Sequence, residues 1–156
     1  MKGQAVKRIR CPEEISMLTF TVMGVRMGVD ADQIAEVMEV DRAEGYGLAV
    51  YRFHEMISFC ETTIQYHAPK AIMIKDKKEP YIVLIDNPED IASVKVRSIQ
   101  PMPPLIAMNS GMRMFWGAIP GNHGIILLVD FLRLRERQGG RLQQMLKPIN
   151  IREVRE

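Results

Sequence analysis

Short apolar runs that alternate with polar residues recur along the whole chain, and turn signals separate them at close spacing. The clearest run is LTFTVMGVRMGVD at 18–30, in which Met23-Gly24 marks a turn between two alternating halves. Further pairs of runs lie at 71–85, around a charged turn, and at 112–129, around a glycine-containing turn. Long helical segments do not alternate with these runs, which disfavours a parallel α/β sheet. The pattern predicts an all-β fold made of hairpins, as a barrel or a sandwich.

Three shorter segments also have strand composition: 33–40, which fits one short helix equally, 48–53 and 91–96. Residues 56–66 fit no single pattern and stay open between helix and strand. The prolines at 101, 103 and 104 are expected to keep their surroundings irregular, because proline lacks a backbone N–H.

A chain of 156 residues suggests one domain, or two very small intertwined ones, and it is long enough to bury a core. We expect an N-terminal lead at 1–16, a folded domain at 17–134 and a C-terminal helix or tail at 135–156. The last part is rich in Arg, Leu and Gln, although Gly139-Gly140 weakens the middle of a helix there.

The net charge of +2 hides an uneven distribution, with basic ends and an acidic body. Six acids between Asp30 and Glu44 give the 33–40 segment a strongly negative flank. Basic ends can contact nucleic acid or anionic lipid, but no aromatic residues are interleaved with these charges. We therefore expect neither a nucleic-acid partner nor insertion into a membrane.

Cysteine usage and hydropathy point to the cytoplasm. Cys11 and Cys60 lie far apart and form no C-x-x-C pair, so a disulfide framework is not expected. No apolar run approaches the roughly 20 residues of a membrane span. The basic N-terminus continues into Cys11-Pro12-Glu13-Glu14 where a signal peptide needs its apolar region.

Metal, phosphate and cofactor motifs are not evident in the sequence. The three histidines, His54, His67 and His123, are widely separated, whereas paired metal ligands usually stand at short spacing. The chain contains no P-loop, no G-x-S-x-G and no H-E-x-x-H. We expect no cofactor and no metal.

Two carboxylates, Asp86 and Asp130, each follow an apolar run and could serve acid–base chemistry with His123 as a partner. The structural interpretation is favoured, because an Asp after a strand often caps the following helix. His123 and Asp130 would also stand a strand apart, roughly 20 Å. A small enzyme or ligand-binding barrel using Asp86, Asp130 and His123 remains the least favoured alternative, and we expect a non-catalytic binding module.

The order of these segments resembles the CheW-like family, which comprises the chemotaxis coupling proteins and the related domain of CheA histidine kinases. The resemblance runs from about Leu18 to Leu134. The 18–30 block is similar to the family's opening F-x-L strand, turn and Y-G-[IV]-D strand, with Met27 where an aromatic is usual. Ile34-Ala35-Glu36-Val37 matches the family's V-x-E-[IV].

Two later blocks carry the same resemblance. KAIMIKDKKEPYIVLIDNPEDI at 70–91 is similar to the family's hairpin that ends in V-D-x-V-x-x-[VI], and Ile99, Pro101 and Pro103 follow like its I-x-P-x-P. GAI at 117–119 with ILLVDFLRL at 126–134 is similar to the closing hairpin. The resemblance implies two SH3-like β-barrels packed together, followed by a C-terminal helix.

The chain departs from the family pattern in two places. The usual Asn-Leu-Arg-Gly segment is absent between Asp41 and Leu48, which leaves the first barrel short of about one strand. Ile82 stands where the second hairpin normally has glycine. Because a missing strand exposes a sheet edge, we expect either a replacement strand from 56–68 or pairing with another chain.

The resemblance implies a cytoplasmic adaptor that couples a methyl-accepting chemotaxis receptor to a CheA-type histidine kinase. The residues it marks for protein binding are Ile34 and Glu36, with Gly28 as a close-packing neighbour. Each has a structural alternative: Ile34 in the core, Glu36 as a solvated rim charge and Gly28 as a strand-crossing residue. The second hypothesis is a diverged CheW-like domain that self-associates or serves as a scaffold in another pathway.

Overall fold

The computed structural model describes residues 12–57, 64–107, 114–122, 124–133, 149 and 151. Strands dominate it, and the helical elements have three or four residues each. The strands are β1 (Glu14–Val22), β2 (Val25–Asp30), β3 (Ile34–Met38), β4 (Val50–Arg52), β5 (Pro69–Ile74), β6 (Tyr81–Asp86), β7 (Ala92–Lys95), β8 (Gln100–Pro101), β9 (Phe115–Gly121) and β10 (Gly124–Val129). The helical turns are η1 (Ala31–Gln33), α1 (Val40–Ala43), η2 (Glu44–Tyr46), η3 (Phe53–Met56), η4 (Val96–Ser98) and α2 (Pro104–Ala107).

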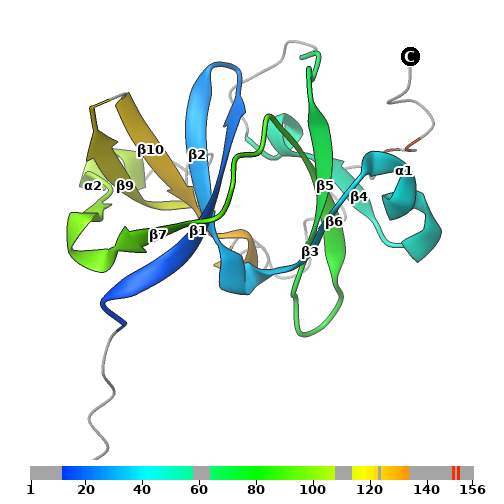
Figure 1. The fold of residues 1–156 in the computed structure, drawn as a ribbon, viewed down its shortest axis with the longest axis horizontal. Helices are drawn as coiled ribbons and strands as arrows, with labels where there is room; N and C mark the ends of the chain where they lie inside the picture. The colour runs from blue at the N-terminus through cyan, green and yellow to red at the C-terminus, as the bar shows by residue number, and fades with distance from the viewer. Residues whose placement is uncertain are drawn as a thin grey trace, which may run out of the picture.

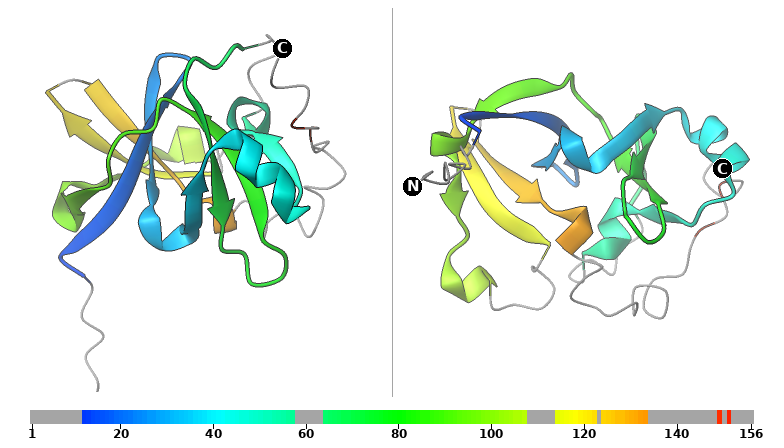
Figure 2. Two further views of the ribbon diagram at one scale, coloured as in Figure 1. Left: turned by 45° about the vertical axis from the view of Figure 1, so that its right-hand side comes forward. Right: turned by 90° about the horizontal axis from the view of Figure 1, so that it is seen from below.

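The strands form two curled sheets that lie side by side (Figure 1). The six-stranded sheet has the order β7-β1-β2-β10-β9-β8, and the four-stranded sheet has the order β3-β5-β6-β4. Within each sheet one pair of strands is parallel, β2 with β10 and β4 with β6, while the others are antiparallel. The chain crosses from one sheet to the other at η1, directly after β2 (Figure 2).

The three predicted hairpins are present as β1–β2, β5–β6 and β9–β10. The first has a two-residue turn in which Met23 (φ 58°) and Gly24 (φ 73°) both adopt the left-handed conformation. Such turns match the right-handed twist of the paired strands, which explains the Met-Gly signal in the sequence. The 33–40 segment, open between strand and helix, forms β3.

The main core fills the space between the two sheets. It includes Phe20 and Val29 from the six-stranded sheet with Ile72 and Val83 from the four-stranded one. A second group, here called the outer cluster, packs on the opposite face of the four-stranded sheet: Met38, Ala43, Val50, Ala71, Ile82, Leu84 and Ile151. All six residues of β6 are buried, because both faces of its sheet are covered.

The proline-rich stretch corrects one expectation, because its surroundings are not wholly irregular. Pro101 belongs to β8, where it pairs with Gly117 at the edge of the six-stranded sheet. Pro104 begins α2. Both places tolerate proline: an edge strand needs fewer N–H donors, and the first N–H of a helix has no partner within the helix.

The four-stranded sheet agrees with the expected loss of a strand, since α1 and η2 occupy the stretch between β3 and β4. The expected replacement strand at 56–68 is not found in its described part: Met56 ends η3, and 64–68 form no strand. Residues 58–63 lie outside the described residues. The amide of Ile149 instead donates to the Val50 carbonyl oxygen at 2.8 Å.

At the N-terminal end the described strands begin earlier than the proposed domain limit at residue 17. β1 begins at Glu14, inside the proposed lead of 1–16, and Glu14 pairs with Lys95 of β7. A helical turn follows β10 at 131–133. The proposed helix at 135–156 lies outside the described residues, apart from positions 149 and 151.

Candidate protein-binding surface

Glu36 stands on β3 with both carboxylate oxygens engaged. The Tyr46 hydroxyl donates to Oε2 at 2.7 Å, and the Arg42 guanidinium lies 2.9 Å from Oε1. Arg42 comes from α1 and Tyr46 from η2, which are the turns that replace the missing strand. This arrangement gives the carboxylate a fixed orientation at the surface, next to Tyr46, which is 40% exposed.

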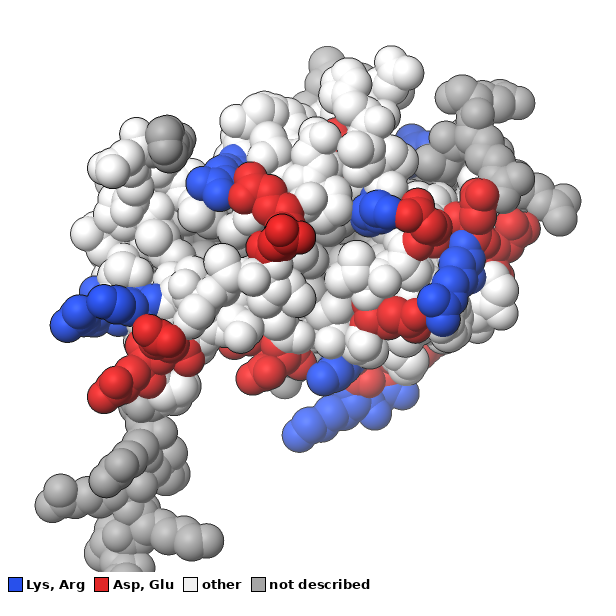
Figure 3. All heavy atoms as spheres, viewed as in Figure 1, with Lys and Arg blue, Asp and Glu red and all other residues white. Residues whose placement is uncertain are grey.

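The surroundings of Glu36 are acidic. Glu39 pairs with Lys70 of β5 beside it, and Asp41 follows in α1. Figure 3 shows acidic side chains gathered over the α1 and β3 side of this face, with basic side chains between them. The negative flank expected from the sequence is therefore a surface feature, and its charges are partly balanced.

Tyr46 also belongs to this group, although the sequence at Glu44–Gly47, with its two glycines, indicates only a loop. The one available signal was an aromatic residue between two glycines beside an acidic segment. The hydrogen bond to Glu36 raises the pKa of the Tyr46 hydroxyl above its usual 10.0, and Arg42 opposes this shift.

Replacing Glu36 by glutamine is expected to lower the pKa of Tyr46 toward 10.0, because the carboxylate that stabilises the protonated hydroxyl is lost. NMR titration of the Tyr46 ring signals measures this change. Glu39→Gln is the matched control, since Glu39 pairs with Lys70 instead. An unchanged Tyr46 pKa in Glu36→Gln would contradict the described hydrogen bond.

Ile34 and Glu36 lie on opposite faces of the four-stranded sheet, although alternation would place residues two apart on one face. The register of β3 against β5 shifts between them, so that Ile34 is opposite Ile74 and Glu36 is opposite Met73. Ile34 packs on the main core, while Met73 packs on the outer cluster. A β-bulge causes this switch, because it inserts an extra residue into one strand.

Val37 is the exposed apolar residue of β3. It pairs with the core residue Ile72, but 41% of its surface stays accessible. Val37 therefore lies on the same face of β3 as Ile34, but its side chain remains accessible to solvent. β3 thus offers two different surfaces, an apolar one at Val37 beside the partly buried Ile34 and a polar one at Glu36, Arg42 and Tyr46.

Gly28 does not join either surface. It lies in β2 between Thr19 of β1 and Leu128 of β10, and it is buried. A Cβ atom there would stand 3.0 Å from Cγ and Sδ of Met17 and 3.3 Å from Ile126. This position supports the close-packing interpretation, and substitutions at Gly28 should act on stability before binding.

Asp130 caps the turn that follows β10, as the structural interpretation expects. Its Oδ1 accepts the Arg133 amide at 3.0 Å and the Gln33 side-chain amide at 3.1 Å. Gln33 also accepts the Phe131 amide, so it ties η1 to the end of β10. His123 lies outside the described residues.

Asp86 is likewise structural. It is buried, and its carboxylate accepts the backbone N–H groups of His67, Ala68 and Asn87 at 2.7–3.1 Å. This geometry holds the chain entering β5 against the end of β6, where Asn87 takes a left-handed conformation. Both oxygens serve backbone donors, which accounts for a buried carboxylate without a catalytic role.

His54 is buried in η3 beside Tyr66. Its Nδ1 lies 2.9 Å from the Tyr66 hydroxyl, which also accepts the His54 backbone N–H. Burial lowers the pKa of His54 below 6.5 and raises the pKa of Tyr66 to about 12. The tyrosine hydroxyl therefore stays protonated and is placed to donate to the neutral ring.

We expect the free energy of unfolding to decrease as the pH falls below 6.5 toward the lowered pKa of native His54. The unfolded state then binds a proton that the native state does not, and above 6.5 this contribution is fully present. Urea unfolding at about pH 7.5 and about pH 5 measures the difference. His54→Asn should reduce this dependence, whereas His67→Asn, at an exposed site, should retain it.

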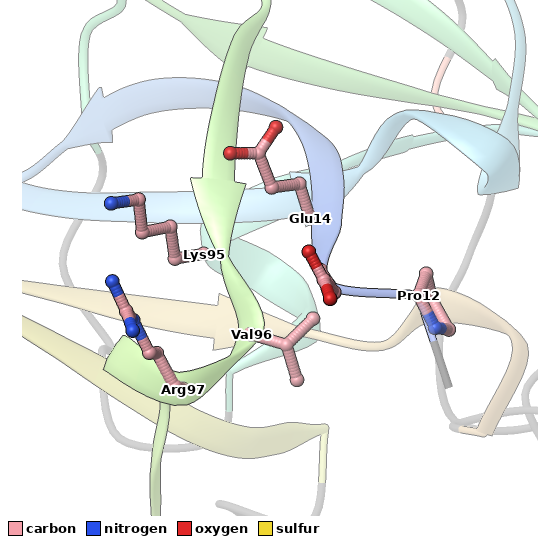
Figure 4. Close-up of a pocket in the computed structure, with 6 residues that line it drawn as sticks. Pro12, Glu14, Lys95, Val96 and Arg97 are labelled. Atoms are coloured by element: carbon pink, nitrogen blue, oxygen red, sulfur yellow. The ribbon is translucent and has the colours of Figure 1, made fainter. Parts of the chain in front are cut away.

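No group of three metal-ligating side chains occurs among the described residues, and none of the described helices is long and apolar enough to cross a membrane. One pocket of about 430 Å³ lies where β1 begins, next to the end of β7. Figure 4 shows acidic and basic side chains around it, from Glu14, Lys95 and Arg97. Its mixed charges select no single class of ligand.

Comparison with solved structures identifies the fold. Neither protein-family models nor curated protein sequences match the chain. Its structure is similar to that of the scaffolding protein TtCheW from Thermoanaerobacter tengcongensis, with a TM-score of 0.63 and 14% sequence identity. The match covers 81% of this chain and 90% of that one. The chain therefore has the CheW-like fold, and the predicted all-β architecture of two packed barrels is confirmed.

Proposed function

We propose that this chain is a non-catalytic adaptor that couples methyl-accepting chemotaxis receptors to a CheA-type histidine kinase. The observation that carries the proposal is the structural likeness of this chain to a CheW scaffolding protein, which covers 81% of the chain. The roles found for Asp86 and Asp130 support it, since both candidate catalytic carboxylates serve backbone and capping bonds.

The two surfaces of β3 fit an adaptor with two partners. Val37 presents an exposed apolar side chain on the face where Ile34 packs against the main core, while Glu36, Arg42 and Tyr46 present an oriented polar group on the other face. Exposed Tyr and Arg side chains are enriched at protein interfaces, and oriented charges set the register of binding. We assign protein binding to both surfaces of β3.

The test is a pull-down of the full chain with the regulatory domain of the cognate kinase and, separately, with a receptor tip peptide. Binding to either supports coupling. Val37→Asp and Glu36→Lys should each weaken at least one partner by about ten-fold, and they should differ in which partner they weaken. Ile91→Asp is the matched control, because Ile91 is exposed and directly precedes β7 of the other sheet.

Binding to neither partner, together with stable self-association in a mass measurement, would contradict the coupling proposal. That outcome would favour the diverged, self-associating scaffold. The absent Asn-Leu-Arg-Gly segment favours this second function, since it changes the stretch between β3 and β4 where α1 and η2 now stand.

A further inference from the structure

The outer edge of β1, on the side away from β2, is covered by another strand over only part of its length. β1 pairs with β2 from Met17 to Val22, whereas its pairing with β7 ends at Met17. Beyond that point the Thr19 carbonyl oxygen accepts the Glu89 amide at 2.8 Å. Residues two apart in a strand direct their backbone groups to the same edge, so the amide and carbonyl of Thr21 also face outward. No described strand pairs with this outward side of Thr21.

The uncovered part of β1 has the composition of a segment that pairs readily with a copy of itself. Residues 17–23 read MLTFTVM, without a charge, a proline or a glycine. Short uncharged segments rich in aromatic and β-branched residues pair between molecules when they stand at a sheet edge. The side chains of Leu18, Phe20 and Val22 are buried, which leaves the outward backbone groups as the accessible part of the segment.

Residues 87–90, here called the strap, run from β6 toward β7 along this edge (Figure 1). Glu89 fastens the strap to β1 and β2. In addition to its backbone bond, its carboxylate accepts the Thr19 hydroxyl at 3.0 Å and Nη2 and Nε of Arg26 at 2.7 and 3.3 Å. These donors hold the pKa of the Glu89 carboxyl below its ordinary value, so it is ionised at neutral pH. One residue thus covers the edge of β1 with both its backbone and its side chain.

The composition of the strap suits the protection of a sheet edge. Pro88 has no backbone N–H, and Glu89 and Asp90 are adjacent acids. Prolines, charged side chains and covering loops are the means by which proteins prevent an edge from pairing with another chain. We infer that the strap protects the outer edge of β1 from the same edge of a second copy of this chain, and that Glu89 holds the strap in place.

A second copy is the partner that this edge fits, because the uncharged segment is complementary to itself. Two such edges carry no like charges that repel each other, and antiparallel pairing about a two-fold axis closes as a dimer. The strap must leave first, since the Glu89 amide occupies the Thr19 carbonyl oxygen. The inference does not rest on receptor or kinase binding, because this edge belongs to the six-stranded sheet and β3 to the other.

The experiment compares Glu89→Ala with the unmodified protein, both as the full chain, by sedimentation over a range of concentrations. Glu89→Ala should lower the dissociation constant of the dimer by at least about ten-fold, because the strap loses its side-chain bonds. Asp90→Ala is the matched control, since it removes the neighbouring exposed carboxylate and leaves those bonds intact. Equal dissociation constants for the two variants would overturn the inference.

Thr21→Pro tests whether the edge of β1 is the surface that pairs. Proline removes the outward N–H of Thr21 but none of the bonds between β1 and β2. Glu89→Ala combined with Thr21→Pro should therefore return to the dissociation constant of the unmodified protein. Self-association through another surface would occur in all the variants and would not depend on Glu89. An association of Glu89→Ala that Thr21→Pro leaves unchanged would also overturn the inference.

Hydrogen exchange of the unmodified protein decides the case if a variant does not fold. The Glu89 amide should be protected, because it donates to Thr19, but it should exchange faster than the core amides of β6. The Thr21 amide should exchange more slowly as the protein concentration rises, because pairing between copies covers it. A Glu89 amide that exchanges only with global unfolding, or a Thr21 amide that is independent of concentration, would rule out a releasable strap over this edge.

Discussion

Replacing Phe53 by alanine is expected to lower the free energy of unfolding by about 3–5 kcal/mol. The ring of Phe53 in η3 is fully buried. Its centroid lies 5.0 Å from that of Phe20 and 6.0 Å from that of Phe131, and both contacts are edge to face. Phe20 belongs to β1 and Phe131 follows β10, so the cavity would open where the two sheets meet. The substitution removes apolar burial and both aromatic contacts at once.

Urea unfolding tests this loss, because the midpoint and the slope of the transition together give the free energy of unfolding. Phe53→Leu should cost less, because it leaves a smaller cavity. Leu105→Ala, at a side chain that is 86% exposed, should change the free energy by less than about 0.5 kcal/mol. A loss below about 1 kcal/mol for Phe53→Ala would show that the two sheets do not depend on this contact.

Replacing Asp86 by alanine is expected to cost about 3 kcal/mol or more. Oδ1 accepts the Ala68 amide at 2.7 Å, and the amides of His67 and Asn87 also donate to the carboxylate. Without the carboxylate these three backbone donors lose their acceptor at a part-buried site, and an unsatisfied buried group costs about 1–3 kcal/mol.

Asp86→Asn is the matched variant for the charge, since it keeps one acceptor oxygen and should lose an intermediate amount. Asp90→Ala removes an exposed carboxylate four residues along the chain and should be nearly neutral. Equal stabilities of Asp86→Ala and Asp90→Ala, measured by urea unfolding, would mean that the backbone donors find other acceptors.

Elements set by neighbouring residues could be predicted from the sequence. The β1–β2 turn follows from Met23-Gly24, and the cap at Asp130 follows from an Asp placed between a strand and a helical turn. The alternation of β1 predicts which side chains face the core. Steric limits within a few residues decide these features, so a single sequence contains them.

The candidate site was only partly predictable. Ile34 and Glu36 were identified on one strand, but the register shift against β5 places them on opposite faces. Tyr46 joins Glu36 only because α1 and η2 fold back toward β3. Gly28 was singled out with them, yet it is packed against Met17 in the other sheet.

The sequence by itself therefore determined the class of fold, the hairpins and the local caps. Tertiary structure alone decided the parallel pairing of β2 with β10 and of β4 with β6, the faces of β3 and the placement of Ile149 beside Val50. The physical reason is the range of the contacts. Alternation specifies that a strand has an apolar face, whereas the identity of its neighbour depends on burial that distant segments supply together.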